Sequence, residues 1–248
     1  MNRFIYFISL FIILSLSTTD ATMADSGWFQ KGKDLFGSVS GSDTGSSQLS
    51  NDVIGDGLKE ALRVGTDTVV KQLGKSDGFN ADPNIHIPLP DNLKTVNSML
   101  HKAGMGSMMD DLELRLNRAA ELATPKTKEL FVNAISEMTL EDVQTIYDGS
   151  DDAATQYFKG KMTQPLTKAM RPIVDSSLAE VGAIKTYDNV MGQYRAIPFV
   201  PDVKANLTNY VLEKGMDGIF YYIAREEAAI RKDPAKRTTE LLQRVFGQ

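Results

Sequence analysis

The stretch that most constrains the fold runs from Asp111 to Phe158, where apolar residues recur three and four positions apart. This spacing places them on one face of an α-helix, as packing on a core requires. Capping residues and glycines interrupt the pattern, so the stretch predicts several successive helices. The same spacing covers residues 51–74, and residues 207–230 are apolar on more than one side, which predicts a buried central helix.

Two short proline-rich segments break the helical pattern. In residues 75–91 three prolines forbid a regular helix, and the run Ile-His-Ile-Pro-Leu-Pro is typical of extended backbone. The second segment is Pro-Phe-Val-Pro at 198–201. No repeat of solenoid length is present. The sequence therefore predicts one irregular all-α domain of eight to ten helices over residues 51–248, with two short extended segments.

Prolines and glycines also predict local details of the helices. Thr124 followed by Pro125 is typical of a helix start, because proline is favoured at the first helical position. Pro165 predicts a second start, and Pro172 predicts a kink. In the stretch 207–230, the pattern Gly-Met-Asp-Gly at 215–218 would let a neighbouring segment approach closely.

The chain opens with the features of an export signal. Arg3 precedes an apolar run of about a dozen residues, which is too short to span a membrane and is followed by small residues that suit signal peptidase. We expect residues 1–24 to be a cleaved signal peptide and the mature protein to be periplasmic, without a stable membrane anchor. A retained N-terminal anchor is the alternative. Residues 25–50 contain a Gly/Ser-rich tract that predicts a flexible segment.

Composition narrows the possible chemistry. The chain has no cysteine, which excludes disulfides, thiolate metal sites and a cysteine nucleophile. Its formal net charge of -5 argues against nucleic acid as a partner. The two histidines, His86 and His101, do not have metal-ligand spacing. No nucleophile elbow, dinucleotide fingerprint or Walker loop is present. We therefore expect no metal and no cofactor.

Charged residues supply one candidate site. Arg118 and Glu121 are three apart in a helical stretch and could pair on a helix flank. Alternatively, Arg118 meets Asp151 or Asp152 in a cleft and holds an anionic ligand group, because a guanidinium is a fork-shaped donor for carboxylate or phosphate. Tyr157 completes the candidate ligand-binding set. Capping of a helix start is the competing explanation for Asp151 and Asp152.

Long phrases of the sequence carry a family resemblance. They are GLKEALRVGTDTVVKQLGKSDGF, IPLP, ELRLNRAAE, DDAATQYF, PFVP and IRKDPAKRTTELLQRVFG. In this order, and over residues 56–247, they resemble the bacterial envelope family known as domain of unknown function 4197. The resemblance implies a mostly helical, exported, single-domain protein. It implies no activity, cofactor or catalytic residue. Some members carry a lipoprotein cysteine, which this chain lacks.

The sequence favours a binding protein over an enzyme. The leading hypothesis is a non-catalytic periplasmic protein that binds a protein partner or a small, partly apolar ligand in a helical cleft. The alternative is a hydrolase or lyase that uses Asp151, Asp152 or Glu121 as acid and base. A third hypothesis is a structural envelope protein that acts through the segment around Trp28. Carboxylates that converge in a pocket would favour the enzyme, and carboxylates used in helix caps would favour binding.

Overall fold

The computed structural model describes residues 49–139 and 143–247. These residues form eight α-helices and two short 3-10 helices, and no strand. The α-helices are α2 (Asn51–Leu73), α3 (Lys94–Lys102), α4 (Gly106–Glu137), α5 (Val143–Tyr147), α6 (Ala153–Glu180), α7 (Ala183–Arg195), α8 (Leu207–Lys232) and α9 (Glu240–Phe246), and the 3-10 helices are η1 (Asp91–Leu93) and η2 (Pro234–Lys236).

The all-α prediction is therefore confirmed for the described part of the chain. Residues 75–90 and 196–206, which contain the two proline-rich segments, lie between helices as turns and extended backbone. The predicted signal peptide, Trp28 and nearly all of the segment 25–50 lie outside the described residues.

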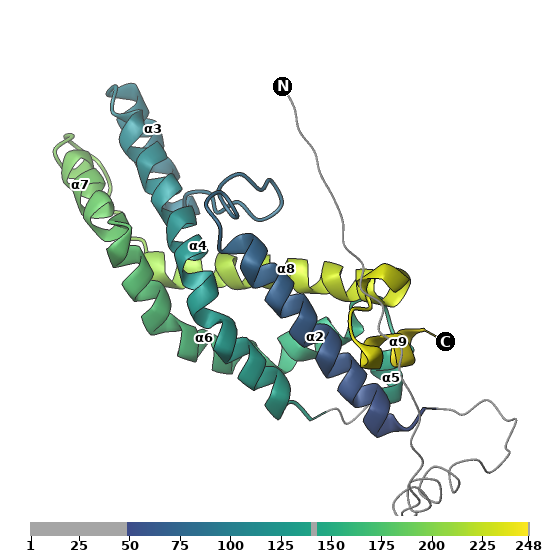
Figure 1. The fold of residues 1–248 in the computed structure, drawn as a ribbon. Helices are drawn as coiled ribbons and strands as arrows, with labels where there is room; N and C mark the ends of the chain where they lie inside the picture. Colours follow the sequence, from purple (N-terminus) through teal and green to yellow (C-terminus); the bar gives the residue numbers. More distant parts are fainter. Residues whose placement is uncertain (1–48, 140–142, 248) are drawn as a thin grey trace, which may run out of the picture. The chain divides into compact units, whose positions relative to one another are not determined.

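Three long helices form a layer that a fourth helix crosses. In Figure 1, α2, α4 and α6 lie side by side, with α4 in contact with both of the others. α8 crosses this layer and contacts all three. Phe131 of α4, Phe158 of α6 and Phe220 of α8 are buried together, with ring centroids 5.7, 5.9 and 6.3 Å apart. This aromatic cluster is where the apolar faces of the three helices meet.

The prediction that α8 is a buried central helix is confirmed, since its buried side chains face more than one neighbour. Gly218 allows the closest approach. A Cβ atom at this position would lie 2.9 Å from the ring of Phe79 and 3.2 Å from Cβ of Ile85. Gly215 is less crowded, because its Cβ would lie 4.0 Å from that of Ala120. The segment that follows α2 can therefore lie directly on α8 only because residue 218 lacks a side chain.

Two helices run through prolines, two of which, Pro125 and Pro165, were predicted to start new helices. Pro125 lies inside α4, and Pro165 and Pro172 lie inside α6. The predicted helix starts are therefore wrong. Each proline removes one N–H donor from its helix. Beside Pro125, the buried hydroxyl of Thr124 donates to the carbonyl of Ala120 at 2.8 Å. Burial of long apolar faces against neighbouring helices outweighs the local preference for a break.

A buried ion pair connects α8 to α5 and α6. Glu227 is fully buried and accepts the backbone N–H groups of Ala154 and Thr155 at 3.0 and 2.7 Å, in the first turn of α6. The guanidinium of Arg231 donates to the same carboxylate at 2.8 Å and to the carbonyl of Tyr147, at the end of α5, at 2.8 Å. Backbone N–H groups at the start of a helix and C=O groups at its end have no partner within the helix. The ion pair therefore caps two helices at once.

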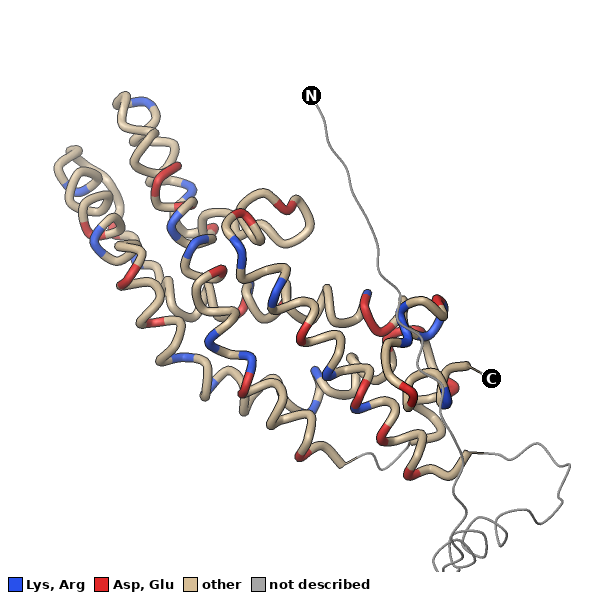
Figure 2. The backbone as a smooth tube through the Cα atoms, viewed as in Figure 1, with Lys and Arg blue, Asp and Glu red and all other residues tan. Residues whose placement is uncertain are grey.

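Figure 2 shows that acidic and basic residues are interspersed along the helices outside this pair. Several form exposed ion pairs, such as Lys126 with Glu180 at 2.9 Å and Lys159 with Asp217 at 3.0 Å. Exposed pairs of this kind contribute little to stability, because water screens both charges. The pair on α8 is different, since Glu227 is fully buried and the side chain of Arg231 is only 10 % exposed.

We predict that Glu227→Ala lowers the free energy of unfolding by about 3–5 kcal/mol, because it leaves the Arg231 guanidinium buried without its partner. The matched control is Glu226→Ala on the same helix. Glu226 lies 3.6 Å from Lys236 in a weaker, more exposed pair, and its loss should cost under about 1 kcal/mol. Urea unfolding measures both. Equal losses would show that the buried pair does not hold α5 and α6.

Candidate functional site

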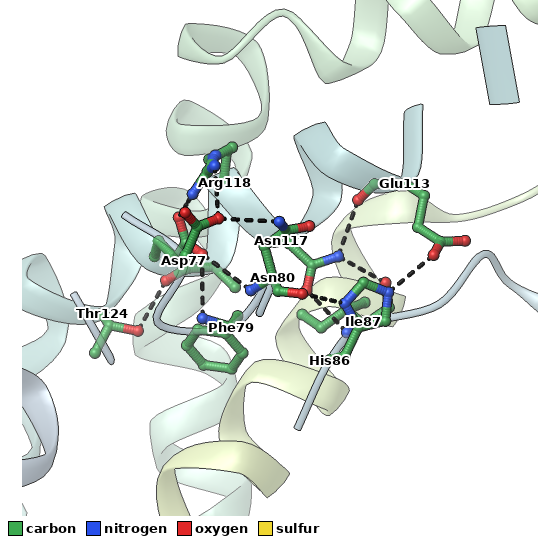
Figure 3. A network of polar contacts seen from close by, with 11 residues as sticks. Asp77, Phe79, Asn80, His86, Ile87, Glu113, Asn117, Arg118 and Thr124 are labelled. Atoms are coloured by element: carbon green, nitrogen blue, oxygen red, sulfur yellow. Dashed lines mark hydrogen bonds and ion pairs between the residues drawn. The ribbon is translucent and has the colours of Figure 1, made fainter. Parts of the chain in front are cut away.

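Three polar side chains on one face of α4 point toward residues 77–90. They are Glu113, Asn117 and Glu121, which are four residues apart and therefore lie on the same side of the helix. Asn117 and Glu121 are buried and Glu113 is half-buried. We call these three residues the α4 polar face. Figure 3 shows the network that they form with the segment after α2.

Asn117 binds the backbone of Ile87 on both of its polar groups. Its Oδ1 accepts the Ile87 N–H at 2.9 Å, and its Nδ2 donates to the Ile87 carbonyl at 2.8 Å (Figure 3). A neighbouring β-strand would pair with extended backbone in a similar way. Nδ2 also donates to the carbonyl of Glu113 at 3.0 Å, so the amide is satisfied although it is fully buried.

Glu121 fixes the turn that precedes this extended backbone. Its Oε1 accepts the N–H groups of Phe79 and Asn80, both at 3.1 Å. Arg118 donates to its Oε2 at 2.7 Å and, through its other terminal nitrogen, to Asp77 at 2.8 Å. The hydrogen bond to Glu121 raises the pKa of Arg118, and hydrogen bonds from Asn80 and Arg118 lower the pKa of Asp77. The expected pairing of Arg118 with Glu121 is confirmed.

His86 connects the turn to the third residue of the α4 polar face. Its Nδ1 lies 2.9 Å from the carbonyl of Asn80, and its Nε2 lies 2.8 Å from Oε1 of Glu113 (Figure 3). The other carboxylate oxygen of Glu113 accepts the N–H of Leu89 at 3.1 Å. Both ring partners of His86 are acceptors, so both bonds form when both ring nitrogens carry a proton.

The segment is also attached to α8. The hydroxyl of Tyr222 donates to the carboxylate of Asp82. Burial raises the pKa of Asp82, but hydrogen bonds from Tyr222 and Asn84 outweigh burial, so that the pKa is lowered overall. The hydrogen bond to Asp82, together with burial, raises the pKa of Tyr222. The turn is therefore held between two helices, α4 on one side and α8 on the other.

A groove lies between this fixed segment and the first half of α8. Its volume is about 830 Å³, within the range of small-molecule sites. Its lining side chains are mostly polar, and the residues are Asn84, Ile85, His86, Pro88, Pro90, Asp91, Asn92, Asn206, Asn209, Tyr210, Glu213, Lys214, Asp217, Gly218 and Tyr221. We call this cavity the α8 groove.

The pKa of Tyr210 reflects the charges around the α8 groove. Burial raises the pKa of Tyr210, and the negative charges of Asp91, Glu113 and Glu213 raise it further. The Nζ of Lys214 lies 5.9 Å from the centroid of the Tyr210 ring, within reach of a cation–π contact.

The expected contact between Arg118 and Asp151 or Asp152 is wrong. Arg118 and Glu121 line a pocket of about 440 Å³ near the end of α2, whereas the two aspartates line a separate groove of about 620 Å³ between α6 and α8. The start of α6 is fixed on α8 by Glu227. The aspartates beside that start therefore face α8 rather than Arg118.

The interpretation of Asp151 and Asp152 as helix caps is confirmed only for the position of Asp152. Asp152 occupies the N-cap position of α6 but makes no side-chain cap bond. Its carboxylate accepts from Gln156 and Ser150 instead, and these two hydrogen bonds lower its pKa. Asp151 pairs with Lys232. Glu227 already occupies the capping site at this helix start, so that a local cap is not required.

Tyr157 lies in neither groove. Its hydroxyl donates to the carbonyl of Thr139, just beyond the end of α4, at 2.8 Å. In the described residues no group of three or more histidine, aspartate and glutamate side chains is arranged to hold a metal ion. A separate search of the same residues reveals no helix with the length and apolarity needed to cross a membrane.

Sequence reasoning missed Glu113, Asn117 and Glu227. A signal for the first two is present, because both lie beside buried leucines of α4 and are spaced four apart with Glu121. Polar residues at that spacing on a buried face require hydrogen-bond partners. Glu227 gave no comparable signal, since its backbone partner Thr155 is 72 residues away.

We predict that Arg118→Ala lowers the free energy of unfolding by about 1–3 kcal/mol, since it leaves the buried carboxylate of Glu121 without its cation. Combined with Glu121→Gln, its effect should be non-additive by about 1 kcal/mol or more, because the two side chains share one contact. Combined with Asp152→Asn, the effects should add within about 0.5 kcal/mol. Urea unfolding of the singles and doubles decides this. Coupling to Asp152 instead would contradict the described network.

Comparison with known proteins places this chain in a family. The model of a family described as protein of unknown function (DUF4197) matches residues 48–247, which include the α4 polar face and the α8 groove. No curated protein and no solved structure matches the chain. The match covers well over half of the chain. The chain therefore belongs to the DUF4197 family.

Proposed function

We propose that this protein is an exported, non-catalytic binding protein whose ligand lies in the α8 groove. One observation carries the proposal: the segment that forms the wall of the groove is held in place by polar side chains of α4, which bind the backbone of Phe79, Ile87 and Leu89. A wall fixed before binding reduces the entropy that a ligand must overcome. A solvent-exposed loop with no function would not require two buried polar anchors and a third that is half-buried.

The lining of the α8 groove supports a polar ligand. Three asparagines, Asn92, Asn206 and Asn209, line the groove, and an amide can both donate and accept. Part of this capacity is used within the fold, because Asn206 accepts the Asn209 N–H and Asn92 donates to the carbonyl of Lys204. Tyr210 and Tyr221 add aromatic faces with a hydroxyl at the edge. A ligand that carries many hydrogen-bonding groups would match this lining better than the partly apolar ligand that the sequence suggested.

The arrangement of carboxylates favours binding over the hydrolase or lyase alternative. Glu121 already accepts two backbone N–H groups and Arg118, and it lines a different cavity from Asp151 and Asp152. The pKa of Asp152 is lowered, whereas a carboxyl that acts as a general acid near neutral pH needs a raised one. These observations support binding over an acid and base pair that includes Glu121, although Asp151 and Asp152 share one groove.

The proposal includes export because residues 1–24 have the features of a secretion signal. The positive Arg3, the short apolar run and the small residues after it match a cleaved secretion signal. The absence of cysteine is compatible with any compartment and does not bear on this point. In this proposal the binding function belongs to the periplasm.

We predict that a photoreactive side chain in the α8 groove captures the ligand inside the cell. The change is Glu213→p-benzoylphenylalanine, which replaces an exposed groove residue of α8. Illumination of whole cells followed by intact-mass spectrometry should reveal an adduct, because the probe lies where the ligand binds. The mass of the adduct also distinguishes a small molecule from a protein.

The matched control is Asp56→p-benzoylphenylalanine, at an exposed position of α2 outside both grooves. No adduct is expected there. An unmodified protein at position 213, or equal labelling at positions 213 and 56, would contradict the proposed site.

A further inference from the structure

Two cavities follow one another along α8. The first is the α8 groove, and the second is the groove of about 620 Å³ between α6 and α8, which we call the α6 groove. Asp217 and Tyr221 line both, so the two grooves meet at this point of the helix. Their lining on α8 extends from Asn209 to Ala228, a path of about 28 Å at a rise of about 1.5 Å per residue. This length suits a chain of several linked units better than one small molecule.

Two tyrosines with the same local arrangement lie along this path. Tyr210 and Tyr221 are close to three turns apart at about 3.6 residues per turn, so both lie on one face of α8. Each has a cation four residues further on. Nζ of Lys214 lies 5.9 Å from the centroid of the first ring, and the guanidinium carbon of Arg225 lies 5.5 Å from that of the second. Tyr222 also meets the ring of Tyr221 edge-on, with centroids 5.1 Å apart. The path therefore offers two aromatic rings that neighbouring side chains support.

The wall of the α8 groove offers backbone acceptors but no free backbone donor. The three N–H groups within residues 86–90 are already bound, at His86 by the carbonyl of Asp82 and at Ile87 and Leu89 by side chains of α4. The other two residues are prolines, which have no N–H. A peptide strand that paired with this wall would need donors as well as acceptors. A ligand that faces the wall must therefore donate, as the hydroxyl groups of a sugar do.

Both signs of charge line the path, and most of the acidic groups are already paired. The charged lining residues are Asp91, Asp151, Asp152, Lys159, Glu213, Lys214, Asp217 and Arg225. Three of the five acidic residues form ion pairs with lysines, and a fourth, Asp152, accepts hydrogen bonds from neighbouring side chains. A nucleic acid would meet the carboxylates, and a polyamine would meet the three cations, at a cost in free energy. An uncharged chain avoids both repulsions.

We propose that the two grooves together bind one linear, uncharged oligosaccharide along α8. Its hydroxyl groups donate to the backbone carbonyls of the wall and to the carboxylate of Glu213, and they accept from the amide of Asn209. The apolar C–H faces of two of its sugar rings lie on Tyr210 and Tyr221. The inference rests on the proposed function, because the α8 groove forms the first part of the path.

Capture at two positions tests both the length and the chemistry of the ligand. The first probe is Glu213→p-benzoylphenylalanine, and the second is Gln156→p-benzoylphenylalanine, at an exposed residue of α6 that lines the α6 groove. After illumination of whole cells, both proteins should carry adducts with the same series of masses, spaced by one sugar residue. Fragmentation of the adducts should release sugar ions. Asp56→p-benzoylphenylalanine on α2 remains the control and should carry no adduct.

Variants of Tyr221 test the contact at the point where the two grooves meet. Tyr221→Leu keeps an apolar side chain but removes the ring, so the yield of adduct at positions 213 and 156 should fall about fivefold. Tyr221→Phe keeps the ring and should restore most of the yield. The melting temperatures of both variants should stay close to that of the wild type, since Tyr221 is 37 % exposed. An equal yield with tyrosine, phenylalanine and leucine would reject the proposed path.

The outcomes of the capture experiment separate this inference from the proposed function. Adducts at position 213 but not at position 156 would reject a path through both grooves. Adducts of another class at both positions, such as a peptide, a lipid or a nucleotide, would reject an oligosaccharide. In these two cases the α8 groove would remain a binding site. No adduct at position 213 would reject the proposed function and this inference together.

Discussion

The hydrogen bonds between the α4 polar face and the backbone after α2 determine how the rest of the structure can be arranged. Extended backbone in a helical protein has no strand to pair with, and a buried N–H or C=O without a partner is costly. Asn117 supplies both partners for Ile87, and Glu121 supplies the acceptor for Phe79. With its backbone satisfied, the segment can lie on α8 at Gly218 and form the wall of the α8 groove.

The same physical solution occurs twice in the molecule. Glu121 and Glu227 are both buried carboxylates that accept two backbone N–H groups from a distant part of the chain. Each also has an arginine within one helical turn, Arg118 and Arg231. The arginine compensates the charge, and the backbone N–H groups occupy the remaining acceptor sites. Such carboxylates are structural, because backbone N–H groups and an arginine occupy their acceptor sites.

Much of the fold could be predicted from local pattern. The spacing of apolar residues predicts α2 and α8, and the Gly-Met-Asp-Gly run predicts the close approach at Gly218, because both depend on residues within a few turns. The breaks predicted at Pro125 and Pro165 are wrong, since local preference there is outweighed by packing between long helices.

The candidate site could be predicted only in part. The pairing of Arg118 with Glu121 is local and follows from their spacing on a helix. The contact of Arg118 with Asp77 spans 41 residues, and no pattern in one sequence indicates it. The α8 groove could not be predicted either, because its walls are far apart in the chain. Which residues lie opposite each other is decided by tertiary packing.

Native-state hydrogen exchange at the backbone amides of Ile87 and Leu89 tests the central claim most directly. If the α4 polar face holds this segment, the amide of Ile87 exchanges slowly in the wild type, because Asn117 accepts its proton. In Asn117→Leu, exchange at Ile87 and its neighbour Leu89 should accelerate, while the amide of Phe220 in the core of α8 keeps its protection. Fast exchange at Ile87 in the wild type, or no change in the variant, would contradict the account.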